Sequence, residues 1–274
     1  MKLAVLVLLL AGAGCNTDSA APHLARGNVL VNNGHREEAV AEYREAARLS
    51  PRSAHPRERL GDTLYDLGRK DEALLAYRDA AGVDPGSVTA RIGAARILGD
   101  KGDLAGARKE LDTALQGAPT NLFLLLSRGN LAARAGDRKA ALADYERAVH
   151  LKSDNVPALY QYGVALLGDG QLPEAAATFE RLVQVSPQSP EGYYGRARVL
   201  AARGEGSGAA EALAEAARRV GPDARAHLAE QGLKGEALDK AARDATEGSL
   251  RQMQNDPAFL RWAGDPGFQR TAWR

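Results

Sequence analysis

The most constraining feature of this sequence is an internal repeat with a period of 34 residues. Alanine recurs six times at that spacing, as Ala39, Ala73, Ala107, Ala141, Ala175 and Ala209. Glycine does the same five residues earlier, as Gly34, Gly68, Gly102, Gly136, Gly170 and Gly204. A period of this length is typical of solenoids, in which each unit buries its apolar face only by stacking on its neighbours. The question of one or two conventional domains is therefore secondary to the number of units.

Further positions keep the same register. We number them within units that begin at residues 20, 54, 88, 122, 156 and 190. Position 8 is always small, as Gly27, Gly61, Ala95, Gly129, Gly163 and Ala197. Position 24 is always bulky, as Tyr43, Tyr77, Leu111, Tyr145, Phe179 and Leu213. Apolar residues inside the units recur every three or four positions and never alternate, which predicts helices and no strands.

The pattern resembles the tetratricopeptide repeat, whose units read W-x2-L-G-x2-Y, then A-x3-F, then P. Three differences are mild: the opening Trp is absent, Ser153 replaces the final Pro of unit four, and that Pro shifts to Pro222 in unit six. The resemblance implies an all-α, right-handed superhelical solenoid of antiparallel helix pairs, A and B. The six expected repeats are 20–53, 54–87, 88–121, 122–155, 156–189 and 190–223. Position 15 glycine should end helix A, and positions 8 and 20 should lie where A and B cross.

After residue 223 the pattern fades. We expect residues 224–274 to form a C-terminal helical cap, with one helix near 224–231, a glycine-containing turn, and another near 236–254. Two Asp-Pro turns follow, each leading to an aromatic residue, and Phe259, Trp262 and Phe268 are expected to cover the last repeat. The alternative is that this tail is a docking element for a partner.

The N-terminus reads as an export signal. Met1-Lys2 is followed by an apolar run, Leu3 to Leu10, and by small residues that end at Cys15. The stretch Ala13-Gly14-Cys15 resembles a bacterial lipobox, although Gly12 stands where Leu is usual. That resemblance implies that residues 1–14 are removed and that Cys15 is acylated with palmitate-type lipid, which leaves residues 15–19 as a tether. Asn16 after the cysteine favours the outer membrane, facing the periplasm. The alternative is an ordinary secretory signal cut near Ala13 or Ala20.

Composition argues against several function classes. The chain has 36 basic and 35 acidic residues, a net charge of +1, which disfavours a nucleic-acid binder held by phosphate contacts. One cysteine excludes a disulfide framework and a multi-Cys metal site. The five histidines share no ligand spacing, and we expect them to be solvated, with no metal and no cofactor. The segment Gly204 to Gly208 is expected to be a loosened turn. We therefore predict a non-enzymatic protein.

Binding is the function that remains. In tetratricopeptide proteins the inner, concave face is formed mainly by positions 2, 5, 6, 9, 12 and 13 of helix A. On that resemblance we expect a groove for a protein or peptide partner. Its proposed contacts are Asn28, Asp62, Tyr65, Arg96, Asn130, Tyr160, Tyr194 and Arg198. An asparagine amide both donates and accepts, which suits the backbone of an extended ligand.

Two partner classes fit a lipid-anchored scaffold of the cell envelope. Lipoproteins of similar architecture include pilotins that help a type IV pilus secretin assemble. The alternatives are a scaffold for peptidoglycan or polysaccharide export enzymes, and a soluble periplasmic adaptor. An enzyme carried in the last 51 residues is a third class, but that segment is too short for a core of its own.

Overall fold

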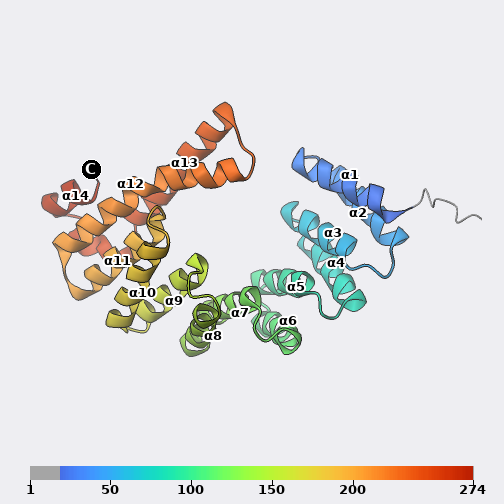
Figure 1. Ribbon diagram of the computed structural model, residues 1–274, viewed down its shortest axis with the longest axis horizontal. Coiled ribbons are helices and arrows are strands. Elements are labelled where there is room, and N and C mark those ends of the chain that lie inside the picture. Colours follow the sequence, from blue (N-terminus) through green and yellow to red (C-terminus); the bar gives the residue numbers. More distant parts are fainter. Residues whose placement is uncertain (1–18, 274) are drawn as a thin grey trace, which may run out of the picture. The chain divides into compact units, whose positions relative to one another are not determined.

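The computed structural model describes residues 19–273, and within that range the chain is built of helices with no strand, as expected. It divides into two compact units, 1–119 and 120–274. The helices of the first unit are α1 (Ala20–Asn32), α2 (Arg36–Leu49), α3 (His55–Asp66), α4 (Lys70–Val83), α5 (Val88–Asp100) and α6 (Leu104–Gly117). Each packs chiefly against the next helix in sequence, so the described part of this unit is three helical hairpins stacked in order (Figure 1).

The second unit continues the same hairpins and adds a tail. Its helices are α7 (Leu122–Arg134), α8 (Arg138–Leu151), α9 (Val156–Gly168), α10 (Leu172–Val185), α11 (Pro190–Arg203), α12 (Gly206–Glu230), α13 (Gly235–Gln254), the short 3-10 helix η1 (Pro257–Trp262) and α14 (Pro266–Ala272). Odd-numbered helices α1 to α11 are the A helices of the expected repeats, and even-numbered helices α2 to α12 are the B helices.

The recurring glycine ends every A helix in the same way. All six position-15 glycines have φ between 75° and 84°, a left-handed conformation that only glycine adopts without strain. The next residue donates its N–H to a carbonyl five residues earlier, for example His35 to Leu30 at 2.8 Å and Glu205 to Leu200 at 2.9 Å. This is the Schellman arrangement, and it satisfies carbonyls that the helix end would otherwise leave open.

The close crossing of helices A and B at position 8 determines which side chains can fill the core there. A Cβ atom added to Gly129 would lie 2.6 Å from Tyr145 Cε1, and one added to Gly163 would lie 2.8 Å from Phe179. In the two repeats with alanine at position 8, position 24 is leucine instead of an aromatic residue. The small and large residues therefore vary together, which keeps the volume at each crossing filled.

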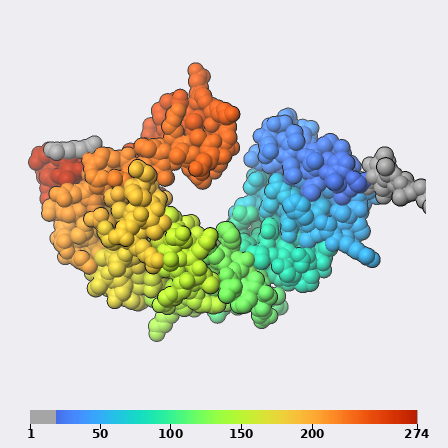
Figure 2. Space-filling view, in the orientation of Figure 1, coloured from blue at the N-terminus to red at the C-terminus, as the bar shows by residue number. Residues whose placement is uncertain are grey.

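The prediction for helix α12 was wrong. The last repeat was expected to end at residue 223 and a separate helix to follow near 224–231, but α12 runs unbroken from Gly206 to Glu230 with Pro222 inside. A proline inside a helix removes one backbone hydrogen bond. Packing of α13 along α12, which buries Leu238 and Ala242, offsets that loss. The tip of this hairpin stands clear of the rest of its unit (Figure 2).

The Gly204–Gly208 segment also differs from its prediction. Gly204 is the left-handed cap of α11, but Gly206 and Gly208 already belong to the first turn of α12. Gly206 is needed there because Trp262 packs on it, with an added Cβ only 2.6 Å from the indole nitrogen.

The C-terminal tail covers the last repeat, as the cap hypothesis expected. Asp256 and Asp265 each cap a helix through side-chain oxygens that accept backbone N–H bonds. Phe259 and Phe268 are buried in one cluster with residues of α11 and α12, and Trp262 stacks on Phe268 at 5.3 Å. Across residues 19–273, no helix combines the length and apolar character needed to cross a membrane.

Candidate peptide-binding face

The eight proposed contacts all lie on A helices, four in each unit. Asn28, Asp62, Tyr65 and Arg96 belong to the first unit and Asn130, Tyr160, Tyr194 and Arg198 to the second. We call the part of each unit formed by positions 2, 5, 6, 9, 12 and 13 of its A helices the inner face of that unit, and each unit is described by itself.

Three position-9 residues carry an internal hydrogen bond that the sequence analysis did not foresee. The hydroxyl of the position-24 tyrosine donates to Asn28 Oδ1 at 2.7 Å, to Asp62 Oδ1 at 2.6 Å and to Asn130 Oδ1 at 2.7 Å, within repeats one, two and four. In the other three repeats position 24 is Leu or Phe, and position 9 is Arg or Val. These side-chain oxygens therefore accept the hydrogen bonds of buried tyrosine hydroxyls. A ligand would meet only the remaining polar atoms of each position-9 side chain.

Burial is the main cause of the raised pKa of two of these tyrosines. Burial, together with the charge of Asp144, raises the pKa of Tyr145 to about 12. Burial and the bond to Asp62 raise the pKa of Tyr77. Both hydroxyls stay protonated and act as donors throughout the physiological range.

The inner face of the first unit is a charged network. Tyr65 donates to Asp100 Oδ2 at 3.0 Å, and Lys70 Nζ binds the same oxygen at 2.9 Å. The Arg96 guanidinium stacks on the Tyr65 ring at 3.7 Å, a cation–π contact. The structure therefore brings Tyr65 and Arg96 together and joins repeats two and three through them.

The inner face of the second unit is partly apolar where its first two A helices lie, with Asn130 and Arg134 of α7 as its polar members. Helix α9 contains no charged residue, and Phe123 on α7 has 69% of its surface exposed. The Tyr160 side chain is half-buried, and its ring centroid lies 6.3 Å from that of Phe179. Burial raises the pKa of Tyr160. Sequence reasoning missed Phe123, although an aromatic residue at an inner position of helix A was the available signal.

The tail occupies the C-terminal part of that face. Asp256 accepts a hydrogen bond from the Tyr194 hydroxyl, and Arg198 Nε lies 3.3 Å from the same carboxylate as an ion pair. Phe259 packs 6.3 Å from the Tyr194 ring. Tyr194 and Arg198 were expected to face a ligand, and they instead hold the cap.

The histidines and Cys15 are the other residues that the sequence singled out for possible chemistry. Among residues 19–273 no three His, Cys, Asp or Glu side chains are grouped as metal ligands. His23 is not simply solvated, because its Nδ1 lies 2.7 Å from Glu42. Cys15, the predicted lipidation site, lies outside the described residues.

The family profile described as the tetratricopeptide repeat matches residues 24–88, 58–121 and 126–190, and a second profile of that description matches 166–233. The chain belongs to the tetratricopeptide repeat family. Such proteins are typically interaction scaffolds, so this fold is suited to binding proteins or peptides. A search of curated protein sequences finds no match.

Solved structures share the fold. YrrB, described as a tetratricopeptide protein with an unusual peptide-binding site, is 25% identical, covering 70% of this chain and 98% of its own, with a TM-score of 0.52. A tetratricopeptide protein from Parabacteroides merdae is 17% identical, covering 83% of this chain and 98% of its own, with a TM-score of 0.58. PilF of Pseudomonas aeruginosa is 16% identical, covering 71% of this chain and 88% of its own, with a TM-score of 0.61. At this identity the similarity shows the fold alone.

Proposed function

We propose that this protein is a non-enzymatic scaffold that binds a protein or peptide partner on its inner faces. The observation that carries the proposal is Phe123, a large aromatic side chain left 69% exposed at an inner position of helix α7, because aromatic residues are enriched in the cores of protein interfaces. The peptide-binding site of YrrB, at 25% identity, supports the same class of ligand.

We propose contacts of two kinds, one in each unit. Tyr65 and Arg96 stack as a polar, aromatic pair in the first unit, and the inner positions of the second unit supply Phe123 and Tyr160 as aromatic residues and Asn130 as a polar one. Each group is proposed as a contact surface of its own unit: the first for a polar or charged segment of a partner, and the second for an apolar one. The proposal does not include Tyr194 and Arg198 as direct contacts, because both side chains already bind Asp256.

A photo-crosslinking side chain at Tyr160 tests the partner. Recovery of a secretin would support a role in type IV pilus assembly, and recovery of a peptidoglycan or polysaccharide export enzyme would support the alternative. A probe that yields only non-specific adducts at Tyr160 and at Asn130 would refute binding on this face.

We further propose that the scaffold is anchored to the bacterial outer membrane through acylated Cys15. The support is the sequence Ala13-Gly14-Cys15 after an apolar run, together with the short tether to α1, which begins at Ala20. Fractionation of Cys15→Ala against the wild-type protein tests the anchor. The variant should move to the soluble fraction, and persistence at the membrane would contradict acylation at this residue. Release of the wild type would favour the soluble periplasmic adaptor.

A further inference from the structure

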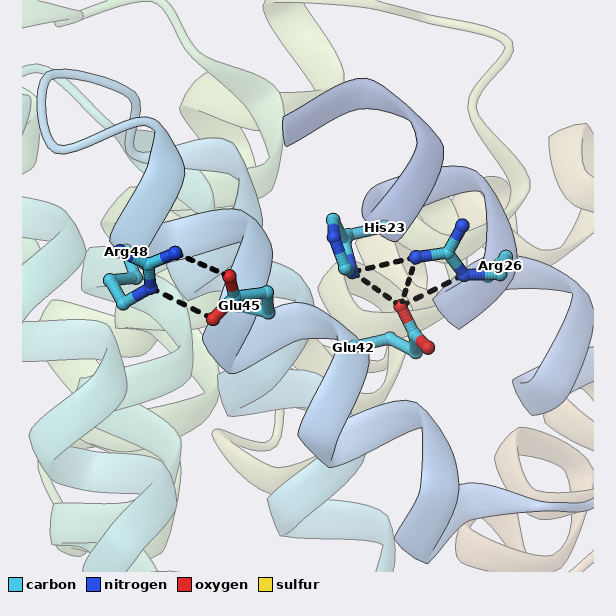
Figure 3. A network of polar contacts seen from close by, with 5 residues as sticks. All are labelled: His23, Arg26, Glu42, Glu45 and Arg48. Atoms are coloured by element: carbon cyan, nitrogen blue, oxygen red, sulfur yellow. Dashed lines mark hydrogen bonds and ion pairs between the residues drawn. The ribbon is translucent and has the colours of Figure 1, made fainter. Parts of the chain in front are cut away.

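Repeat six has an incomplete version of a polar pair found in other repeats. Position 23 of helix B faces positions 4 and 7 of helix A, on a different side of helix A from the inner-face residues. In repeat one Glu42 binds His23 at 2.7 Å and Arg26 at 3.1 Å, as Figure 3 shows. The position-23 carboxylate therefore neutralises the cation that helix A presents to it.

Two more repeats build the same pair with other residues. In repeat three Arg91 donates to Glu110 at 2.7 Å. In repeat four Arg128 binds Asp144 through two nitrogens, at 2.8 and 2.7 Å, and the Asp144 residue is only 4% exposed. A two-pronged arginine–carboxylate contact is among the strongest polar contacts in proteins.

The remaining repeats show what happens without the acid. Repeat two has Leu60 at position 7 and Ala76 at position 23, and its position-4 arginine, Arg57, donates to backbone carbonyls instead. Repeat five has Tyr162 and Thr178. Repeat six alone keeps an arginine at position 7, Arg196, opposite an alanine, Ala212.

A cavity lies where repeat six lacks the carboxylate. A pocket of about 520 Å³ opens between α11 and α12, lined by Arg196, Ala212, Tyr193, Leu200, Gly208 and Thr271, among others. Gly208 and Ala212 leave it wide, and Thr271 of α14 belongs to its wall. Its volume is within the range of small-molecule sites.

The walls are held in place, whereas the arginine is only loosely paired. Arg219 stacks on the Tyr193 ring at 3.9 Å, and the Tyr193 hydroxyl donates to the Pro187 carbonyl at 3.2 Å. Within residues 19–273, the ion pair of Arg196 is with Glu180, whose carboxylate lies 3.5 Å from Arg196 Nε, and the two side chains are 40% and 51% exposed. Such an exposed ion pair contributes little, so it exchanges readily for a better carboxylate.

Other charges on the pocket wall largely cancel. Glu215 accepts from both Arg218 and Arg219. Glu211 also lines the pocket and forms no ion pair within the described part of the chain, so it disfavours an anion that lies near it. A carboxylate is therefore favoured at the Arg196 end, with the uncharged part of the ligand along Tyr193, Leu200 and Ala212.

We propose that this pocket is a ligand site for a carboxylate attached to an apolar group, with Arg196 as its anion receptor. The ligand supplies the carboxylate that Glu42, Glu110 and Asp144 supply within their own repeats. A small organic acid and the C-terminal carboxylate of a peptide share this chemistry. The proposal does not depend on partner binding at the inner faces.

Calorimetric titration of the full chain tests the site with three probes: 3-phenylpropanoate, the tripeptide Ala-Ala-Phe, and the same tripeptide with an amidated C-terminus. We expect saturable binding of at least one acid and much weaker binding of the amide. Tighter binding of the acid tripeptide than of phenylpropanoate identifies a peptide terminus, and the reverse a small acid. No saturation by either acid up to about 10 mM, beyond the weak end of specific affinities, would overturn the proposal.

Three variants locate the site. Ala212→Glu restores the acid of repeats one, three and four, and should abolish binding while raising the unfolding midpoint. Arg196→Leu, which copies Leu60 of repeat two, should weaken binding at least about tenfold, as expected for loss of a charged hydrogen bond. Ala143→Glu adds the same charge at an exposed position of α8 and should leave affinity unchanged.

The variants also make the test decisive. Unchanged affinity in Arg196→Leu would show that any binding occurs elsewhere and would refute the site, even if Ala212→Glu failed to fold. Direct observation comes from the Arg196 Nε–H resonance of arginine-labelled protein, which should shift with the acid and not with the amide.

Discussion

The hydrogen bond between Tyr145 and Asn130 can be removed without disturbing the packing around it. Tyr145→Phe deletes one oxygen and leaves the ring against Gly129, and repeat five already contains the matching apolar pair, Phe179 with Val164. The bond is 2.7 Å long, the tyrosine residue is 2% exposed, and Asn130 is exposed. Because Asn130 can turn to water, the loss should be near that of an ordinary hydrogen bond, about 1 kcal/mol.

A double-mutant cycle measures this bond. Tyr145→Phe should lower the free energy of unfolding by about 1 kcal/mol, and Asn130→Val by about 1–2 kcal/mol because it leaves the buried hydroxyl without an acceptor. The double variant should cost little more than one single variant, which gives a coupling energy of about 1 kcal/mol. Urea unfolding followed by circular dichroism supplies the three values. A coupling near zero would refute the idea that position 9 serves the tyrosine.

Three further predictions use the same unit. Asp144→Ala should cost about 2–4 kcal/mol, because it removes the buried carboxylate that Arg128 binds through two nitrogens, whereas Glu146→Ala, at an exposed position, should change the urea midpoint little. Gly129→Ala should destabilise by about 1–2 kcal/mol through overlap with Tyr145, while Gly248→Ala, with nothing near its Cβ, should stabilise slightly; thermal unfolding compares them. The pKa of Tyr145 is raised from 10.0 to about 12, so its contribution to stability is complete below pH 10 and lost as pH rises through about 12, and Tyr145→Phe should flatten that decline in alkaline unfolding curves.

Helix positions followed from the sequence because backbone geometry dictates the repeating residues. A glycine with positive φ at position 15 and a small residue at position 8 are requirements of each hairpin by itself, so their spacing predicted the helices. The end of α12 could not be predicted from the sequence, because packing of α13 along α12 overrides the local helix-ending tendency of Pro222.

The candidate faces were less predictable for a different reason. A family pattern tells which positions face inward, but not which of their polar atoms are already bonded. The Asn28 oxygen bonds to Tyr43, and Tyr194 bonds to Asp256, 62 residues away along the chain. The first pairing was visible in the sequence, since Asn or Asp at position 9 accompanies Tyr at position 24 in every case. The second depends on how the tail folds back, which no periodic pattern encodes.

Site-specific photo-crosslinking at Phe123, with Leu151 as its matched control, tests the central claim most directly. Both are large apolar residues exposed on helices of the second unit, by 69% and 45%, but only Phe123 is at an inner position of helix A. Binding on the inner face predicts one discrete protein adduct from a probe at Phe123 and none from a probe at Leu151. Equal adducts from both positions, or an adduct from Leu151 alone, would contradict it.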